Sequence, residues 1–178
     1  MTTHDHDFTA APFLIEERPW SPRLSLRVRP QHRETLARSL GLDLPSRIGH
    51  RSVTDKTELL CLGPDEWLIL VPVQGRDDLL AASAEAYAAT PHSLCEISDR
   101  DITLRLSGPQ ALTALAAGCP RDLGSLPIGN AARTVFDSAT VILWRDGQDS
   151  FRMDVWRSFL PHVRAILHRV EAELSSGL

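Results

Sequence analysis

A pair of apolar runs joined by a four-residue turn constrains the fold of this chain more than any other feature. Residues 58–62 and 67–71 are mostly apolar, and Gly63-Pro64-Asp65-Glu66 lies between them. Pro64 presets the backbone angle that the first corner of a type I or II turn requires. The pattern therefore predicts a β-hairpin, and a hairpin makes at least part of the sheet antiparallel.

Helical patterns stand on both sides of this hairpin. A strand is predicted at Leu24–Arg29, where apolar and polar residues alternate, and a helix from Pro30 to about Leu40 follows it. Gly41 suits the end of that helix because glycine accepts a left-handed backbone without steric cost. A second, alanine-rich helix is predicted over residues 76–89, before Pro91.

The second part of the chain shows the same mixture of strands and helices. Alternating patterns predict strands at residues 94–98, 102–106, 133–136, 140–144 and 151–156. Ser107 and Gln110 have the spacing of a capping box, which predicts a helix from there to about Ala117. Asp146-Gly147 predicts a tight hairpin turn, and an apolar stripe predicts a last helix from Ser158 to about Leu174.

Hairpins interspersed with helices, without strict strand–helix–strand alternation, indicate an α+β fold with antiparallel sheets. We expect an N-terminal arm at residues 1–20, a first α+β half at 21–92 and a second at 93–178, packed into one compact unit. The halves are predicted to be ferredoxin-like, each with helices packed on its sheet. Because the arm contains Phe13, Leu14, Ile15 and Trp20, we expect it to pack on its own domain or on a partner.

The composition restricts the partners and the compartment. The formal net charge is −4, whereas nucleic acids and anionic membranes select basic surfaces, so neither is an expected partner. The N-terminus lacks a basic segment followed by an apolar core, and no apolar run approaches the roughly 20 residues that span a bilayer. Cys61, Cys95 and Cys119 are widely spaced and odd in number. Unpaired cysteines of this kind indicate a reducing compartment, and we expect a cytoplasmic protein.

A search for catalytic motifs identifies no catalytic residue. The sequence has no G-x-G-x-x-G, no phosphate-binding G-x-x-x-x-G-K-[ST] and no G-x-S-x-G, and the predicted capping role accounts for Ser107. The cluster His4, Asp5, His6 and Asp7 has metal-ligand chemistry, but a terminal tail rarely preorganises a site, so no metal site is predicted. Asp99 and Arg100, between two predicted strands, are the candidates for binding a cofactor.

Four segments, in this order, resemble the gamma subunit family of heterotetrameric sarcosine oxidase over about residues 20–170. They are LGPDEWL at 62–68, EISDR at 96–100 continuing through LRLSGP at 104–109, GCPRDL at 118–123 and FRMDVWRSF at 151–159. The resemblance implies a fold related to the folate-binding fold of the aminomethyltransferase (glycine-cleavage T-protein) family, which agrees with the α+β prediction.

The resemblance also implies a role. Enzymes of this kind oxidatively demethylate sarcosine to glycine, transfer the one-carbon unit to tetrahydrofolate and produce hydrogen peroxide. It implies partner subunits called alpha, beta and delta, which hold FAD, FMN, NAD, zinc and tetrahydrofolate, and no cofactor or catalytic residue on this chain. The Cys-Tyr-x-Gly signature of related folate proteins is absent from the sequence.

Two other functions remain open at the level of sequence. The chain could be a stand-alone folate-binding protein of one-carbon metabolism, with Asp99 and Arg100 contacting a pterin or its glutamate tail. It could also bind a metal through the cluster at His4–Asp7. Calorimetry with tetrahydrofolate tests the first, and metal analysis after deletion of the tail tests the second.

Overall fold

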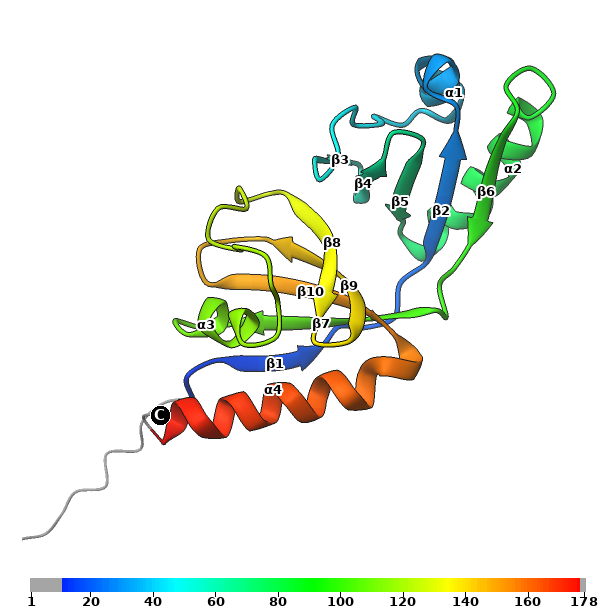
Figure 1. Cartoon of the computed structure of the whole chain (residues 1–178). Coiled ribbons are helices and arrows are strands. Elements are labelled where there is room, and N and C mark those ends of the chain that lie inside the picture. Colours follow the sequence, from blue (N-terminus) through cyan, green and yellow to red (C-terminus); the bar gives the residue numbers. More distant parts are fainter. Residues whose placement is uncertain (1–10, 177–178) are drawn as a thin grey trace, which may run out of the picture.

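The computed structural model describes residues 11–176, which form two five-stranded sheets with two helices against each (Figure 1). The first sheet has the order β3-β4-β5-β2-β6 and the second the order β1-β7-β10-β9-β8, with every neighbouring pair antiparallel. The elements of the first half are β2 (Arg23–Val28), α1 (Arg33–Leu40), β3 (Arg51–Thr54), β4 (Thr57–Gly63), β5 (Glu66–Leu70), α2 (Arg76–Ala86) and β6 (His92–Glu96). Those of the second half are β1 (Leu14–Glu17), β7 (Asp101–Ser107), α3 (Ala111–Ala116), β8 (Ala131–Phe136), β9 (Ala139–Arg145), β10 (Ser150–Trp156) and α4 (Leu160–Ser175).

The α+β prediction is confirmed, and the first half is ferredoxin-like. Its elements run β2-α1-β4-β5-α2-β6, with β3 added at the edge beside β4. In β2 the apolar residues Leu24, Leu26 and Val28 are buried beneath the helices, as the alternation predicts. Gly41 ends α1 with φ of 62°, and its N–H reaches the carbonyls of the last turn.

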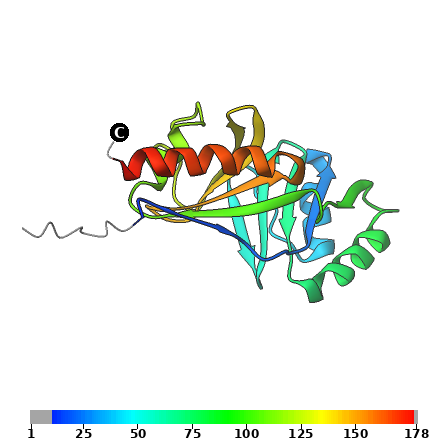
Figure 2. The ribbon, with the colours of Figure 1, turned by 90° about the horizontal axis from the view of Figure 1, so that it is seen from below.

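The second half has the same strand order, but its last strand comes from the other end of the chain. The series β7-α3-β9-β10-α4 lacks a final strand, and β1 fills that position at the edge of β7, with Ile15 opposite Leu106. Figure 2 shows β1 running alongside β7. Phe13, just before β1, is completely buried in the core formed with α3 and α4. The described part of the arm therefore packs on its own domain.

Three details of the sequence prediction are wrong. Residues 92–96 form β6, which pairs with β2, so this strand belongs to the first sheet and not to a second half beginning at 93. Residues 14–17 are a strand of the second sheet rather than a separate arm. Ser107 makes no capping box with Gln110, because Ser107 ends β7 and α3 starts without a side-chain cap. Periodicity identifies a strand, whereas the partner of that strand depends on distant residues.

The two sheets pack through the faces that carry no helices. Leu60 on β4 and Leu68 on β5 meet Ala131, Ile142 and Trp144 of β8 and β9, all of them buried. The layers are thus helices, sheet, sheet and helices. Two backbone hydrogen bonds extend this contact, because the Gly49 carbonyl accepts from Ala131 N–H at 2.9 Å while Gly49 N–H donates to the Cys61 carbonyl at 2.8 Å.

Candidate functional site: the polar cavities between the two sheets

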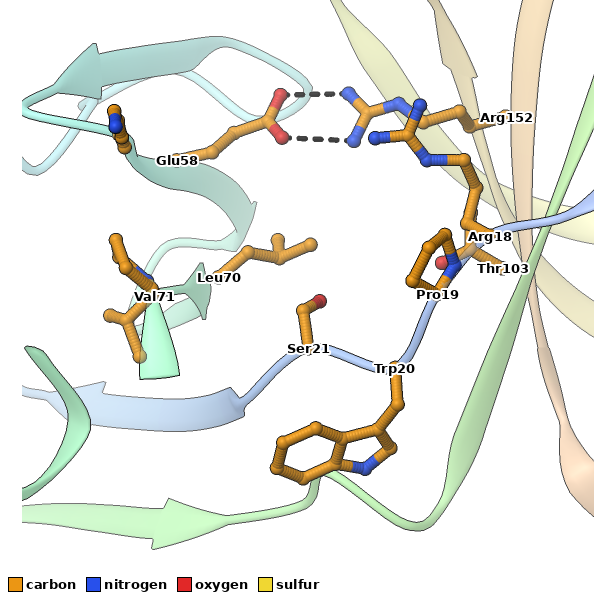
Figure 3. A pocket seen from close by; sticks show the side chains of 11 residues that line it. Arg18, Pro19, Trp20, Ser21, Glu58, Leu70, Val71, Thr103 and Arg152 are labelled. Carbon is orange, nitrogen blue, oxygen red and sulfur yellow. Dashed lines mark hydrogen bonds and ion pairs between the residues drawn. The ribbon is translucent and has the colours of Figure 1, made fainter. Parts of the chain in front are cut away.

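A cavity of about 380 Å³ opens where the chain crosses from β1 to β2 (Figure 3). Residues 18–21 form one side of it, and Thr103 and Arg152 of the second sheet stand beside them. The opposite side comes from the first sheet, with Lys56, Glu58, Leu70, Val71 and Pro72. The cavity therefore draws on both halves of the molecule and exists only when they are docked.

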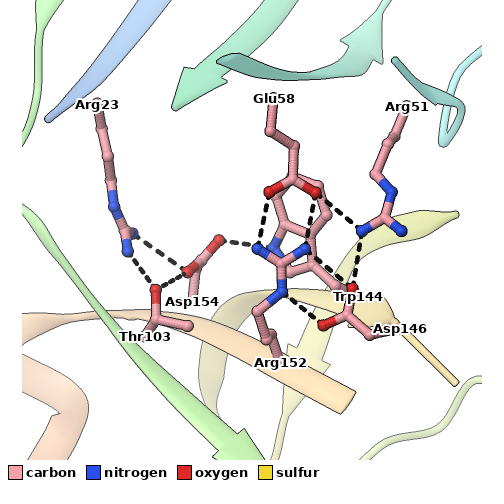
Figure 4. Close-up of polar contacts among 8 residues, drawn as sticks. All are labelled: Arg23, Arg51, Glu58, Thr103, Trp144, Asp146, Arg152 and Asp154. Atoms are coloured by element: carbon pink, nitrogen blue, oxygen red, sulfur yellow. Dashed lines mark hydrogen bonds and ion pairs between the residues drawn. The ribbon is translucent and has the colours of Figure 1, made fainter. Parts of the chain in front are cut away.

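A network of four charged side chains borders this cavity and joins the sheets (Figure 4). Arg152 on β10 donates from Nη1 to Glu58 Oε2 at 2.9 Å and from Nη2 to Glu58 Oε1 at 2.8 Å. Arg152 Nε also donates to Asp146 Oδ2 at 2.6 Å, and Arg51 Nη1 bridges Glu58 and Asp146 at 2.8 and 2.7 Å. The Arg152 guanidinium lies 4.6 Å from the centre of the Trp144 ring. Two cations and two anions thus balance across the sheet interface.

Partial burial shapes the protonation of this network. Burial alone would raise the pKa of Asp146, but hydrogen bonds and attraction from Arg152 and Arg51 outweigh it and lower the pKa. For Arg152, burial disfavours the cation, yet its hydrogen bonds to Glu58 and Asp146 dominate and raise the pKa. Arg152 therefore stays charged at any pH at which the protein folds.

A second cluster is buried and draws its side chains from β2, β7, β9 and β10 (Figure 4). Asp154 accepts a hydrogen bond from Trp144 Nε1 at 2.7 Å and another from Thr103 Oγ1 at 2.5 Å. Arg23 Nη1 lies 3.2 Å from Asp154 Oδ1 and 4.0 Å from Asp101 Oδ2, and Arg23 Nη2 donates to Thr103. A neighbouring cavity of about 280 Å³ is bordered by Arg23, Asp101 and Thr103.

A third cavity, of about 250 Å³, is lined by Asp101 and Asp154 of this cluster. Glu66 also lines this cavity and pairs with two arginines. Its Oε2 atom lies 3.1 Å from Arg133 Nη1 and 3.0 Å from Arg27 Nη2. The hydrogen bond from Arg133 is the main reason that the pKa of Glu66 lies below its usual value. Arg100 and Trp156 also line this cavity.

Asp99 and Arg100, the sequence-based candidates, lie in the turn that connects the two sheets and face different neighbours. The Asp99 carboxylate accepts a hydrogen bond from Trp20 Nε1 at 3.3 Å. Arg100 Nη2 donates to Asp101 Oδ2 at 3.1 Å, and its guanidinium lies 5.8 Å from the Trp156 ring centre. Of the two, Arg100 borders a cavity, whereas Asp99 holds the indole of Trp20 in place.

One contact has the form of a nucleophile and its base. Ser83 Oγ lies 2.7 Å from His92 Nε2, and His92 Nδ1 lies 2.6 Å from the Thr90 carbonyl. The Thr90 carbonyl can accept only from a protonated Nδ1, and in the neutral tautomer with that proton Nε2 accepts from Ser83. Ser83, however, is buried inside α2, where the helix itself uses the neighbouring backbone N–H groups, so no oxyanion site forms beside it. The contact ties α2 to β6.

Among residues 11–176, no three His, Cys, Asp or Glu side chains lie close enough together to hold a metal ion. The cluster at His4–Asp7 lies outside the described residues. Over the same span, no helix is both long and apolar enough to cross a membrane.

The sequence did contain one signal for the buried clusters. Within β10, Arg152 and Asp154 alternate with the apolar residues Met153 and Val155, which places two charges on one face of a central strand. Aspartate is depleted in strands, so this placement indicates a paired, buried carboxylate. The partners Glu58, Arg23 and Thr103 are distant in sequence, and no spacing rule connects them to β10.

Comparison with known proteins identifies relatives over most of the chain. The model of the sarcosine oxidase gamma subunit family matches residues 28–173. The gamma subunit from Corynebacterium sp. (strain U-96) is 31% identical over 168 residues, which cover 92% of this chain and 81% of that protein. The gamma subunit from Arthrobacter sp. is 31% identical over 148 residues, which cover 80% of this chain and 72% of that protein.

Solved structures give the same result. A chain of heterotetrameric sarcosine oxidase from Corynebacterium sp. U-96, solved in complex with pyrrole 2-carboxylate, has a TM-score of 0.83 and 28% identity, covering 94% of this chain and 88% of that one. Aminomethyltransferase T of the glycine cleavage system from Bartonella henselae has a TM-score of 0.65 at 15% identity, covering 89% of this chain and 46% of that chain. The second match shows that the fold is shared, as predicted.

Proposed function

Because this chain belongs to the sarcosine oxidase gamma subunit family, we propose that it is a non-catalytic subunit that assembles with larger chains into a heterotetrameric sarcosine oxidase. The observation that carries this proposal is the structural likeness to a chain of such a complex, which extends over 94% of the sequence at a TM-score of 0.83. The described residues also expose several large aromatic side chains, which suit a contact with a partner.

An aromatic surface suits the contact with a partner. Trp20 is 49% exposed, Trp156 47% and Phe159 38%, although each is a large apolar side chain. The ring centroids of Trp156 and Phe159 are 6.4 Å apart. Asp99 connects this pair to Trp20: its carboxylate accepts a hydrogen bond from Trp20 Nε1, and its backbone carbonyl accepts one from Nε of Arg157, the residue after Trp156. Tryptophan and arginine are enriched among the residues that dominate binding energy at interfaces.

The partners and cofactors form part of the proposal. We place alpha, beta and delta subunits around this chain, with FAD, FMN, NAD, zinc and tetrahydrofolate held by those subunits. The complex would oxidise sarcosine to glycine, pass the one-carbon unit to tetrahydrofolate and produce hydrogen peroxide. A cytoplasmic location belongs to the same proposal, and the three unpaired cysteines support it.

Co-expression with the neighbouring genes tests the assembly. We expect the chain to copurify with a flavoprotein, and Trp156→Ala to weaken that copurification. Tyr87→Ala is the matched control, because Tyr87 is 57% exposed but lies at the end of α2. Expressed alone, the chain should show neither flavin absorbance nor amine oxidation. Turnover by the isolated chain would contradict the non-catalytic role. Copurification that Trp156→Ala leaves as strong as Tyr87→Ala does would contradict the aromatic contact surface.

Folate binding by this chain is the second candidate function, and the position of Arg100 favours it. Arg100 borders the cavity of about 250 Å³ and could pair with a glutamate carboxylate, whereas Asp99 lies against Trp20. Calorimetry with tetrahydrofolate at millimolar concentration decides the matter. A heat of binding that the parent protein shows and Arg100→Gln lacks would support folate binding. No heat of binding with the parent protein would exclude it.

A further inference from the structure

The aromatic surface of Trp20, Trp156 and Phe159 contains a positive charge that the described part of the chain leaves unbalanced. Arg157 follows Trp156 directly and is exposed, and its Nε donates a hydrogen bond to the backbone carbonyl of Asp99 at 3.1 Å. Among residues 11–176, no carboxylate forms an ion pair with Arg157. The chain as a whole has a formal net charge of −4, so this surface differs in charge from the rest of the molecule.

The carboxylates around Arg157 already have other partners. The Asp99 carboxylate accepts the hydrogen bond from the indole of the aromatic surface at 3.3 Å. Asp101 is 5% exposed, and its Oδ2 lies 3.1 Å from Arg100 Nη2. Glu17, which lines the cavity of about 280 Å³ together with Arg157, forms an ion pair with an arginine of α4. A counter-ion for Arg157 therefore has to come from another molecule.

The charge of Arg157 lies close to the rings that a partner would cover. Its backbone N–H donates to the Arg100 carbonyl at 2.9 Å, and the Arg100 guanidinium lies 5.8 Å from the centre of the Trp156 ring. A partner that covers this ring also removes water from the neighbouring guanidinium groups. A charge that loses water without gaining an opposite charge costs binding energy.

On the basis of the assembly proposed above, we propose that the partner covers the aromatic surface with an acidic segment. An Asp or Glu carboxylate of that segment pairs with Arg157, and its apolar side chains pack on Trp156. Because Arg157 Nε binds the Asp99 carbonyl, its two Nη groups remain to hold the carboxylate through charge-assisted hydrogen bonds. A neutral segment would leave the cation unpaired, and a basic segment would repel it.

Zero-length cross-linking tests the contact directly. Lys56 is the single lysine of the chain, so an introduced amine is easily traced. Arg157→Lys places an amine at the aromatic surface, and a water-soluble carbodiimide condenses an amine with a touching carboxylate to an amide while the reagent becomes a urea. In the copurified complex we expect this variant to form an amide with an Asp or Glu of a partner subunit, which mass spectrometry of the peptides identifies.

Two controls accompany the cross-linking. The parent protein measures the reaction of Lys56 and of the terminal amine. Arg169→Lys places an amine at an exposed position of α4 outside the aromatic surface. Neither should yield the product that Arg157→Lys yields.

Charge variants test the energetic part. Arg157→Met keeps an apolar stem without the charge and should weaken binding to the partner about tenfold, and Arg157→Glu should weaken it further because like charges repel. Retention of the chain in the complex during size-exclusion chromatography at increasing salt measures this. Salt should weaken the parent complex and affect the Arg157→Met complex much less. Arg169→Glu is the matched control, and all these variants should keep the parent melting temperature because both positions are exposed.

The possible results separate the acidic contact from the assembly itself. If the parent chain copurifies with no flavoprotein, both are wrong. If it copurifies and Trp156→Ala weakens the complex while Arg157→Glu behaves like Arg169→Glu, the acidic contact alone is overturned. A cross-link from Arg157→Lys that forms only within the chain, to Asp99, or only between two copies of the chain overturns it as well.

Discussion

Arg152 on β10 and Glu58 on β4 form a two-fold hydrogen-bonded ion pair that joins the two sheets, with N–O distances of 2.9 and 2.8 Å. The side chains are 14% and 17% exposed, so the pair is largely shielded from water. Shielded pairs of this geometry are costly to break, because removing one partner leaves the other charge desolvated.

We expect Glu58→Gln and Arg152→Met each to lower the free energy of unfolding by about 2 kcal/mol. The double variant should lose less than the sum of the two, because both substitutions remove the same contact. Urea denaturation of the four proteins measures this coupling. Arg105→Met is the control, since Arg105 is 43% exposed and 4.0 Å from Glu16, and it should change stability by less than about 1 kcal/mol. Strictly additive losses would contradict a direct interaction.

The lowered pKa of Asp146 predicts how stability depends on pH. A carboxyl group whose pKa is lower in the folded state contributes stability above its unfolded pKa of about 3.9, and loses that contribution as the pH falls through the folded pKa. The unfolding free energy should therefore decrease as the pH falls below about 4. Asp146→Asn should be less stable than the parent protein at neutral pH, and the difference should shrink on acidification. A constant difference between the two proteins from neutral to acidic pH would disprove the assignment.

The burial of Phe13 predicts that the segment before β1 supports the second core. Phe13 is 0% exposed, whereas the adjacent Leu14 is 57% exposed. Phe13→Ala should cost about 3–5 kcal/mol, the usual loss for a large buried aromatic side chain. Leu14→Ala should change stability by no more than about 0.5 kcal/mol. Thermal or chemical denaturation compares them, and equal losses would show that the segment does not pack as described.

The three cysteines should differ in reactivity. Burial raises the pKa of Cys61, an effect that a backbone hydrogen bond from Gly63 and the charge of Arg33 offset only in part, and Cys119 is also buried. Cys95 is exposed on β6. In the native protein a thiol reagent should modify Cys95 rapidly and the other two only after unfolding, because the reactive species is an accessible thiolate. Mass spectrometry of labelled peptides identifies the modified residue, and Cys95→Ser should abolish the rapid phase.

Much of the local structure followed from the sequence, because helices and strands impose different periods on nearby residues. The alternation of Leu24, Leu26 and Val28 predicts β2, Gly41 marks the end of α1, and the turn at Gly63–Glu66 produces the β4–β5 hairpin. Four short segments that occur in a fixed order along the chain also indicated the family, and the match of the family model over residues 28–173 confirms it.

Tertiary structure decided which strands pair and which charges meet. No local pattern could place β1 beside β7, about 90 residues further along the chain, or assign β6 to the first sheet, because strand pairing depends on long-range packing rather than on period. The same holds for Arg152 with Glu58, and for the cavity between Arg18 and Lys56. Sequence by itself determined the elements and the family of this protein. Its cavities and buried ion pairs exist because two ferredoxin-like halves dock face to face.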